Sequence, residues 1–115
     1  MQYLLMCCFD EDRWEKIPEA ERDGIMREYG AWVQGVTKSG QHLATAKLRS
    51  SATATTVRFK NGKSVITDGP FAETKEQLGG FYVIDAADLD DAIAIAARIP
   101  PARWGTIEVR PIWEM

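Results

Sequence analysis

The chain has 115 residues, of which 45% are hydrophobic and 27% charged, with a net charge of −3 at neutral pH. This composition suits one soluble domain with its own core. The acidic balance argues against nucleic acid as a main partner, because phosphate backbones attract basic surfaces. No apolar run is long enough to span a membrane, and no basic segment typical of a secretory signal precedes the first apolar run. We therefore expect a single cytoplasmic domain over residues 1–115.

The first third of the chain predicts a buried strand and then a helix. The apolar run QYLLMCCF at 2–9 is typical of a buried strand. Pro18 suits the first turn of a helix, and Gly40 is a natural stop for it. Between them, apolar side chains recur at helical spacing and predict one stripe that faces the core, made of Ile25, Tyr29, Trp32, Val33 and Val36.

The remaining segments predict five strands and a second helix. Strands are expected at 42–48 and 54–59, and Asn61-Gly62 predicts a tight hairpin turn because it tolerates positive φ. A further strand is expected at 79–86. Asp88 can cap a helix that runs to residue 99, with Leu89, Ala92, Ile93 and Ala96 along one side. After a loop at 100–105, a last strand at 106–114 alternates apolar residues.

Without the hairpin, this order is the split βαβ, so the fold class is α+β, ferredoxin-like with an inserted β-hairpin. Both helices then cover one face of the sheet and leave the other open. Yet the segments LLMCC and FYVI are apolar on both faces. We therefore expect a homodimer in which the sheets of two copies pack face to face.

The segment DGPFAETKE, at 68–76, has two interpretations. In the structural one, Asp68 bonds a backbone group two residues on, as Asp does in turns, and Gly69 and Pro70 set the backbone. Phe71 then packs its ring on the core, and the residues that follow form one helical turn. On this view the segment is only a corner before the strand at 79–86.

In the functional interpretation, the same segment presents charge to a ligand. Asp68, Glu73 and Lys75 place both charge signs in a loop, where binding groups concentrate. Glu108 and Arg110 point to one side of the last strand, where they would need each other or a ligand if buried. Asp68 and Glu73 are the candidates for an acid or base, and Lys75 or Arg110 for a group that holds substrate charge.

We expect no metal and no cofactor. Cys7 and Cys8 are neighbours in a strand, so their side chains diverge, and His42 has no second ligand nearby and is expected to be solvated. No glycine-rich phosphate loop is present. The tryptophans are expected in the core or an interface; they are Trp14, Trp32, Trp104 and Trp113.

The segments TDGPFAETKEQLGGFYVIDA, DDAIAIAARIP and GTIEVRPI resemble the YCII-related family, in the branch named for its Asp-Gly-Pro-Phe motif. The resemblance covers nearly the whole chain. It implies a ferredoxin-like subunit that pairs into a dimeric α/β barrel. Members of this branch are bacterial, many are encoded beside extracytoplasmic-function sigma factors, and most have no established activity.

The resemblance does not bring the catalytic pair proposed for the family to this chain. The better-studied YCII branch is proposed to use a His–Asp pair, and by rough alignment those positions are Tyr29 and Ile99 here. Neither side chain can do the work of that pair at neutral pH. Any chemistry would therefore centre on Asp68, Glu73 and Lys75, with Tyr29 as a further ligand-binding candidate beside Phe71 and Arg110.

Three functions stay open from the sequence. The first is a homodimer that binds a small polar molecule in a cleft beside the DGPFAETKE segment. The second is an enzyme that performs proton transfer or hydrolysis with Asp68 or Glu73 as acid or base. The third is a regulatory partner of a sigma factor. Whether any reaction is catalysed, and on which substrate, is left open by the sequence.

Overall fold

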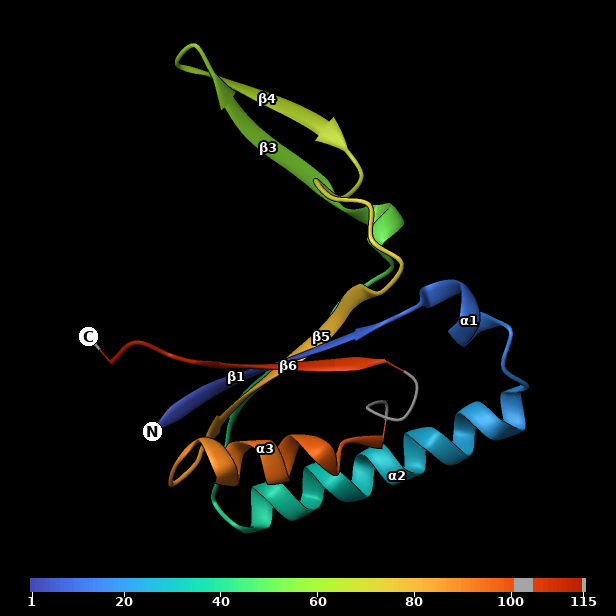
Figure 1. Cartoon of the computed structure of the whole chain (residues 1–115). Helices are drawn as coiled ribbons and strands as arrows, with labels where there is room; N and C mark the ends of the chain where they lie inside the picture. Colours follow the sequence, from blue (N-terminus) through green and yellow to red (C-terminus); the bar gives the residue numbers. More distant parts are fainter. Residues whose placement is uncertain (101–104, 115) are drawn as a thin grey trace.

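The computed structural model describes residues 1–100 and 105–114. Its elements follow the expected order along the chain (Figure 1). They are β1 (Gln2–Phe9), α1 (Glu11–Glu15), α2 (Glu19–Lys38), β2 (His42–Lys47), the short 3-10 helix η1 (Ser51–Thr53), β3 (Thr55–Lys60), β4 (Lys63–Asp68), β5 (Gln77–Asp85), α3 (Leu89–Ala97) and β6 (Thr106–Pro111).

Four of the strands form one antiparallel sheet in the order β2-β5-β1-β6. Helices α2 and α3 lie together on one face of this sheet (Figure 1). This arrangement is the ferredoxin-like α+β fold that the order of elements predicted. The hairpin β3–β4 is inserted between β2 and β5 and forms a separate two-stranded sheet.

The core lies between the sheet and the two helices. Tyr3, Leu5 and Cys7 alternate along β1 on this side and are buried. From α2, the side chain of Trp32 enters the core and its Nε1 donates a hydrogen bond of 3.1 Å to the carbonyl of Ile95 in α3. This bond satisfies the indole N–H in an apolar setting and ties the two helices together. The predicted stripe of α2 is therefore confirmed.

Several helix predictions hold and others need correction. Gly40 has a φ of +77° just after α2, and the Asp88 carboxylate caps α3 by accepting from the Asp91 N–H. The buried side of α3, however, is formed by Ala92, Ile95 and Ala96, while Leu89 and Ile93 are each 49% exposed. The prediction was wrong there because the apolar residues of α3 spread over more than one face. Helix α1, capped by the Asp10 carboxylate, was not predicted.

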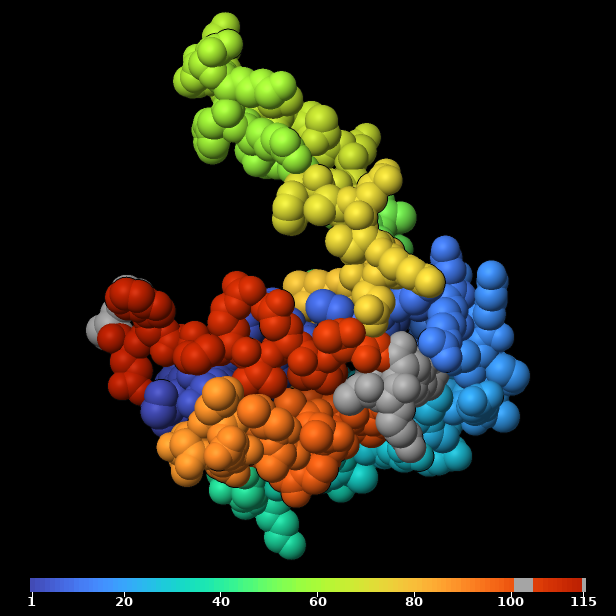
Figure 2. All heavy atoms as spheres, viewed as in Figure 1, coloured from blue at the N-terminus to red at the C-terminus, as the bar shows by residue number. Residues whose placement is uncertain are grey.

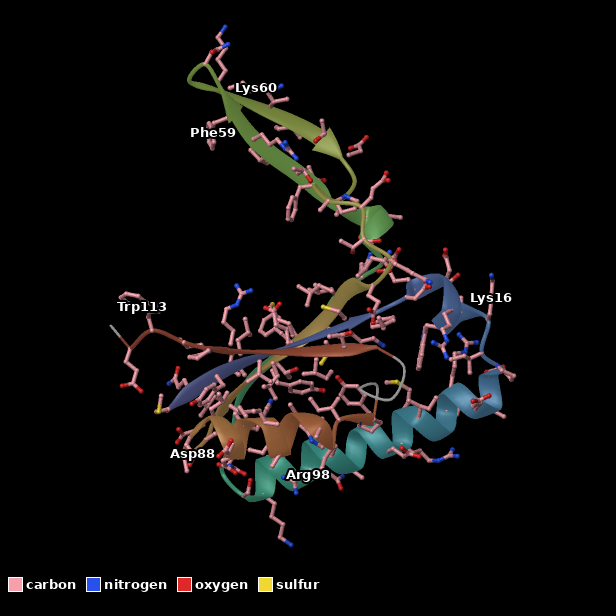
Figure 3. All side chains as sticks on the ribbon, in the orientation of Figure 1. Lys16, Phe59, Lys60, Asp88, Arg98 and Trp113 are labelled. Atoms are coloured by element: carbon pink, nitrogen blue, oxygen red, sulfur yellow. The ribbon has the colours of Figure 1, made fainter. Side chains whose placement is uncertain are left out.

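The tryptophans were predicted to lie in the core or in an interface. Trp32 is a core residue, whereas Trp113 is 87% exposed beyond the end of β6 and lies outside the core of its own chain (Figure 3). Trp104 and most of the predicted loop at 100–105 lie outside the described residues. Within the described residues, no helix is long and apolar enough to cross a membrane.

The hairpin β3–β4 projects from the body of the molecule, on the side of the sheet that carries no helices (Figures 1 and 2). We call residues 55–68 the arm. Asn61 and Gly62 at its tip have φ of 52° and 76°, as predicted for a two-residue turn. The arm makes the chain extended: the radius of gyration is 16.1 Å, whereas a compact domain of this length has about 13 Å.

The second face of the main sheet has no helix over it in the described part of the chain (Figure 1). We call it the open face. The strand register assigns it a set of largely apolar residues that alternate with the core residues: Leu4, Met6, Cys8, Ala44, Ala46, Phe81 and Val83. All seven retain solvent exposure in the single chain. The two-sided apolarity that the sequence indicated is therefore present in the folded subunit.

Candidate functional site

The DGPFAETKE segment forms the return path from the arm to the main sheet. Strand β4 ends at Asp68, and Gly69 has a φ of +93°, which a residue with a side chain rarely adopts. The Gly69 N–H donates to the Ala54 carbonyl at 2.7 Å, and the Gly69 carbonyl accepts from Thr56 Oγ1 at 2.7 Å. Gly69 therefore fixes the corner through its own backbone.

Three parts of the structural interpretation were wrong. The Phe71 ring does not pack on the core of its own chain but is 76% exposed. Residues 70–76 form no helical turn, and the Asp68 carboxylate accepts no hydrogen bond from the described residues. The corner closes by backbone bonds of Gly69 and by Arg58, which donates to the Phe71 carbonyl at 3.3 Å. It therefore needs neither an aromatic anchor nor a carboxylate.

A cavity of about 460 Å³ lies beside this segment. We call it the loop cavity. One wall comes from residues 48–54, between β2 and β3, and the other from residues 70–78, before and within β5. Its lining residues are Leu48, Arg49, Ser50, Ser51, Thr53, Ala54, Pro70, Phe71, Ala72, Thr74, Gln77 and Leu78. The predicted cleft beside the segment therefore has a counterpart in the folded chain.

Glu11 at the start of α1 holds the first wall of the loop cavity in place. Its carboxylate accepts from the backbone N–H of Ser51 at 2.9 Å, from Ser51 Oγ at 2.9 Å and from Ser50 Oγ at 3.3 Å. The backbone N–H of Glu11 donates in turn to Gln77 Oε1 at 3.1 Å, which joins the second wall to the first. These bonds use the hydroxyl donors of both serines.

Arg49 is different from its neighbours in the loop cavity. Among the described residues, its guanidinium makes no ion pair or side-chain hydrogen bond. A guanidinium carries five N–H donors in a planar fork that matches carboxylate and phosphate groups. The sequence reasoning missed Arg49 and Glu11, because Glu11 and Ser51 are 40 positions apart and only the tertiary fold brings them together.

The structure separates the predicted site residues into several places. Phe71 lines the loop cavity. Asp68, Glu73 and Lys75 are exposed on the same segment and do not line it. Arg110 lies on the open face, where its Nη2 donates to Glu108 Oε2 at 2.6 Å. Glu108 and Arg110 thus form an ion pair, which is one of the two outcomes that the sequence allowed.

Tyr29 lies apart from the loop, in a second cavity of about 200 Å³. We call this the inner cavity. It is bounded by α1, α2 and the strands β1, β2 and β5, on the helix side of the sheet. The Tyr29 hydroxyl is 3.6 Å from Cys7 Sγ, and its ring lies 5.8 Å from the ring of Tyr82. Tyr29 therefore belongs to a site distinct from the DGPFAETKE segment.

The ionisable groups around Tyr29 are held in their neutral forms. Burial raises the pKa of Tyr29 well above its ordinary value of 10.0, and the Tyr82 hydroxyl adds to this rise. Burial likewise raises the pKa of Cys7 and of Tyr82. At neutral pH this cluster can donate and accept hydrogen bonds but supplies neither a thiolate nor a general base.

The cysteines diverge as predicted, with Cys7 in the core and Cys8 on the open face. His42 departs from expectation, because its Nε2 is buried without a partner in the described structure and its ring lies 6.0 Å from that of Tyr82. Within residues 1–100 and 105–114, no group of three or more His, Cys, Asp or Glu side chains could hold a metal ion.

Two comparisons with known proteins match nearly the whole chain. The family model of the YCII-related domain matches residues 1–115. An uncharacterized protein from Rhizobium meliloti (strain 1021) is 38% identical over 114 residues, which cover 97% of this chain and 92% of that protein. Both matches extend over essentially the whole chain, arm included. The chain therefore belongs to the YCII-related domain family.

Proposed function

We propose that this protein is a cytoplasmic homodimer that binds a small polar molecule in the loop cavity. The observation that carries the proposal is the cavity itself, which opens beside the DGPFAETKE segment and contains one guanidinium without a partner in the described chain. Ligand sites of this type combine an apolar lining with a few polar groups that fix orientation.

The charge of the ligand follows from the polar groups that remain available. The hydroxyls of Ser50 and Ser51 already donate to Glu11, and Thr53 and Thr74 donate to backbone carbonyls. Arg49 is the group left to recognise a ligand, so the preferred ligand carries a carboxylate or a phosphate.

In this proposal Phe71 forms part of the wall, and Asp68, Glu73 and Lys75 act from the rim. The stretch from Pro70 to Glu76 belongs to no helix or strand, so it is the part of the wall with the fewest backbone constraints. Charged side chains in such a loop can change position to contact a ligand at a low cost in free energy.

The dimer is supported by the open face. A single subunit leaves a row of apolar side chains such as Leu4, Met6, Phe81 and Val83 without cover from its own helices. Sheets of this kind pack face to face at a separation of about 10 Å. The ion pair of Glu108 and Arg110 then enters the interface already neutralised, which limits the desolvation cost.

The arm is a second argument for a partner copy. Four large apolar side chains of the arm are exposed: Val57, Phe59, Val65 and Ile66. Phe71, just beyond the arm, is exposed as well. An isolated two-stranded hairpin is at best marginally stable in water. The arm carries three basic groups and one acidic, so the rest of the chain, with a total of −3, carries −5. A basic, apolar arm is therefore complementary to the acidic body of a second copy.

The first test is the assembly state. Light scattering and sedimentation at micromolar concentration are expected to give the mass of a dimer, with an interface on the order of 2,000 Å² or more. The variant Met6→Glu, which places a charge in the open face, is expected to give a folded monomer. A stable, well-folded monomer of the unaltered chain would exclude the dimer.

The second test is the ligand. Phosphate and citrate are titrated against the labelled protein, and amide shifts are followed by NMR at Ser51 and Thr74. We expect saturable shifts that Arg49→Gln weakens at least tenfold, whereas Lys63→Gln, which removes the same charge at the tip of the arm, has no effect. Binding that responds equally to both variants would reflect net charge alone and would contradict the site.

One observation also favours the regulatory alternative. If the arm stays exposed in the dimer, its apolar side chains are a surface for another protein, such as a sigma factor. The enzyme alternative needs Asp68 or Glu73 beside bound substrate. Because both carboxylates lie outside the described cavity linings, the geometry favours binding over proton transfer.

A further inference from the structure

The inner cavity is a second place where a small molecule fits, and of the lining residues it shares only Leu48 with the loop cavity. Its lining residues are Cys7, Phe9, Trp14, Met26, Tyr29, Thr45, Ala46, Lys47, Leu48, Gly79, Gly80, Phe81 and Tyr82. Its volume is about 200 Å³. A dry protein cavity of about 150 Å³ is known to accept benzene. The inner cavity therefore has room for one six-membered ring and a small substituent.

The walls of the inner cavity suit a flat, apolar molecule. Phe9 and Trp14 meet edge to face with their ring centroids 6.2 Å apart. The rings of Tyr29 and Tyr82 are tilted by 31° to each other. Aromatic walls of this kind favour a planar ring, which can stack on one wall and meet another edge-on.

Two glycines shape one wall of the inner cavity by allowing close packing. A side chain at Gly79 would overlap the ring of Phe9, which therefore rests directly against strand β5. A Cβ at Gly80 would lie 2.9 Å from the carbonyl oxygen of Ala46 on the neighbouring strand. The two glycines thus let the Phe9 ring and strand β2 approach β5 closely and shape the wall between them.

The charge of the inner cavity is confined to its mouth. The thiol of Cys7 and the hydroxyl of Tyr29 line the cavity as neutral, partly buried hydrogen-bonding groups, and the exposed Thr45 adds a further hydroxyl. At the edge of β2, Lys47 is exposed, lines the cavity and makes no ion pair with a described residue. A neutral interior with one free ammonium at the mouth matches a ligand with an apolar ring and one anionic end.

We propose that the inner cavity binds a one-ring aromatic carboxylic acid, with the ring between the walls formed by Phe9, Trp14 and Tyr29 and the carboxylate beside Lys47. The hydroxyl of Tyr29 can donate a hydrogen bond to a substituent on the ring, which fixes how deeply the ring enters the cavity. This site would make the protein a carrier or sensor of small aromatic acids. The inference stands whether or not the loop cavity has a ligand.

Benzoate is the probe for this proposal, and benzamide is its neutral counterpart of nearly equal shape. Both are titrated against the full chain and followed by NMR at the side chains of Tyr29 and Thr45. We expect saturable shifts with both compounds and tighter binding of benzoate. The variant Lys47→Met keeps an apolar stem and removes the charge, so it is expected to weaken benzoate roughly threefold to tenfold and to leave benzamide unchanged.

Two controls separate this site from its surroundings. Arg49→Gln removes a nearby cation that lines only the loop cavity, and it is expected to leave benzoate binding unchanged. Met26→Trp places a large ring at the half-exposed edge of the inner cavity and is expected to block both probes while the circular dichroism stays native. The proposal is overturned if neither probe gives saturable shifts, or if Lys47→Met and Arg49→Gln weaken benzoate equally.

Discussion

Phe59 on the arm offers a quantitative test of whether the arm packs on a second copy (Figure 3). The ring is 79% exposed in the single chain. Full burial of such a side chain contributes about 1.5–3 kcal/mol, and a two-fold dimer has two arms. Covering the exposed part of both rings therefore contributes about 2–5 kcal/mol to association. This corresponds to between roughly 30-fold and a few thousand-fold in the dimer dissociation constant.

The substitution Phe59→Thr removes the ring and retains a side chain that suits a strand. Sedimentation equilibrium over a wide concentration range measures the dissociation constant of this variant against the unaltered chain. Lys60→Thr is the matched control, because Lys60 is the next residue, at the tip of the same arm, and is also exposed. We expect it to change dimer affinity by less than about 1 kcal/mol.

Amide hydrogen exchange gives an independent readout. If the arm packs on a partner, its amides at 55–68 are protected at concentrations where the dimer forms and exchange quickly on dilution. If Phe59→Thr leaves the dissociation constant unchanged, or if arm amides exchange at the same rate at every concentration, the arm is free in the dimer. If a dimer forms despite either result, its interface consists of the open face alone.

Three further outcomes follow from the packing of the core and of the inner cavity. Gly79→Ala would place a Cβ against the Phe9 ring, and we expect a loss of about 1–3 kcal/mol in urea denaturation. Trp32→Phe removes a buried hydrogen bond and part of a core ring, and we expect a loss of about 2–4 kcal/mol in the same assay. The pKa values of Cys7 and Tyr29 are raised in the folded state, so their contribution to stability is complete below the ordinary pKa values of 9.0 and 10.0 and is lost as pH rises above them. Urea midpoints should therefore fall on the alkaline side, and less steeply in Tyr29→Phe; an unchanged slope in that variant would contradict the assignment.

The fold was predictable because local signals and the global arrangement agree. The positive φ of Asn61 and Gly62 and the cap from Asp88 arise within a few residues of sequence. The period of the apolar residues identified the strands and the buried stripe of α2. The weak case was α3, whose residues are apolar almost all round. There, only the position of the helix on the sheet decides that Ile95 is buried and Ile93 is exposed.

The candidate site was harder to predict because its parts meet through tertiary contacts. The sequence pointed to the DGPFAETKE segment, and a cavity does lie beside it. It gave no sign that Glu11 would hold Ser51, or that Arg49 would line the opposite wall. Phe71 was misjudged because an aromatic residue in a corner usually points inward. In this fold the corner lies at the root of an arm, where the single chain has no interior to receive the ring.

The shape of the arm has a consequence for how the protein behaves when newly made or diluted. A two-stranded sheet has two free edges, and each presents backbone N–H and C=O groups that can pair with any other strand. Val65 and Ile66 of β4 are apolar residues of high strand propensity, so they favour the addition of this strand to a foreign sheet edge. Lys60 and Lys63 flank the tip and repel a second arm in parallel alignment. Charge on these two lysines would therefore act as protection against misassembly, and neutralising both should raise the rate of aggregation.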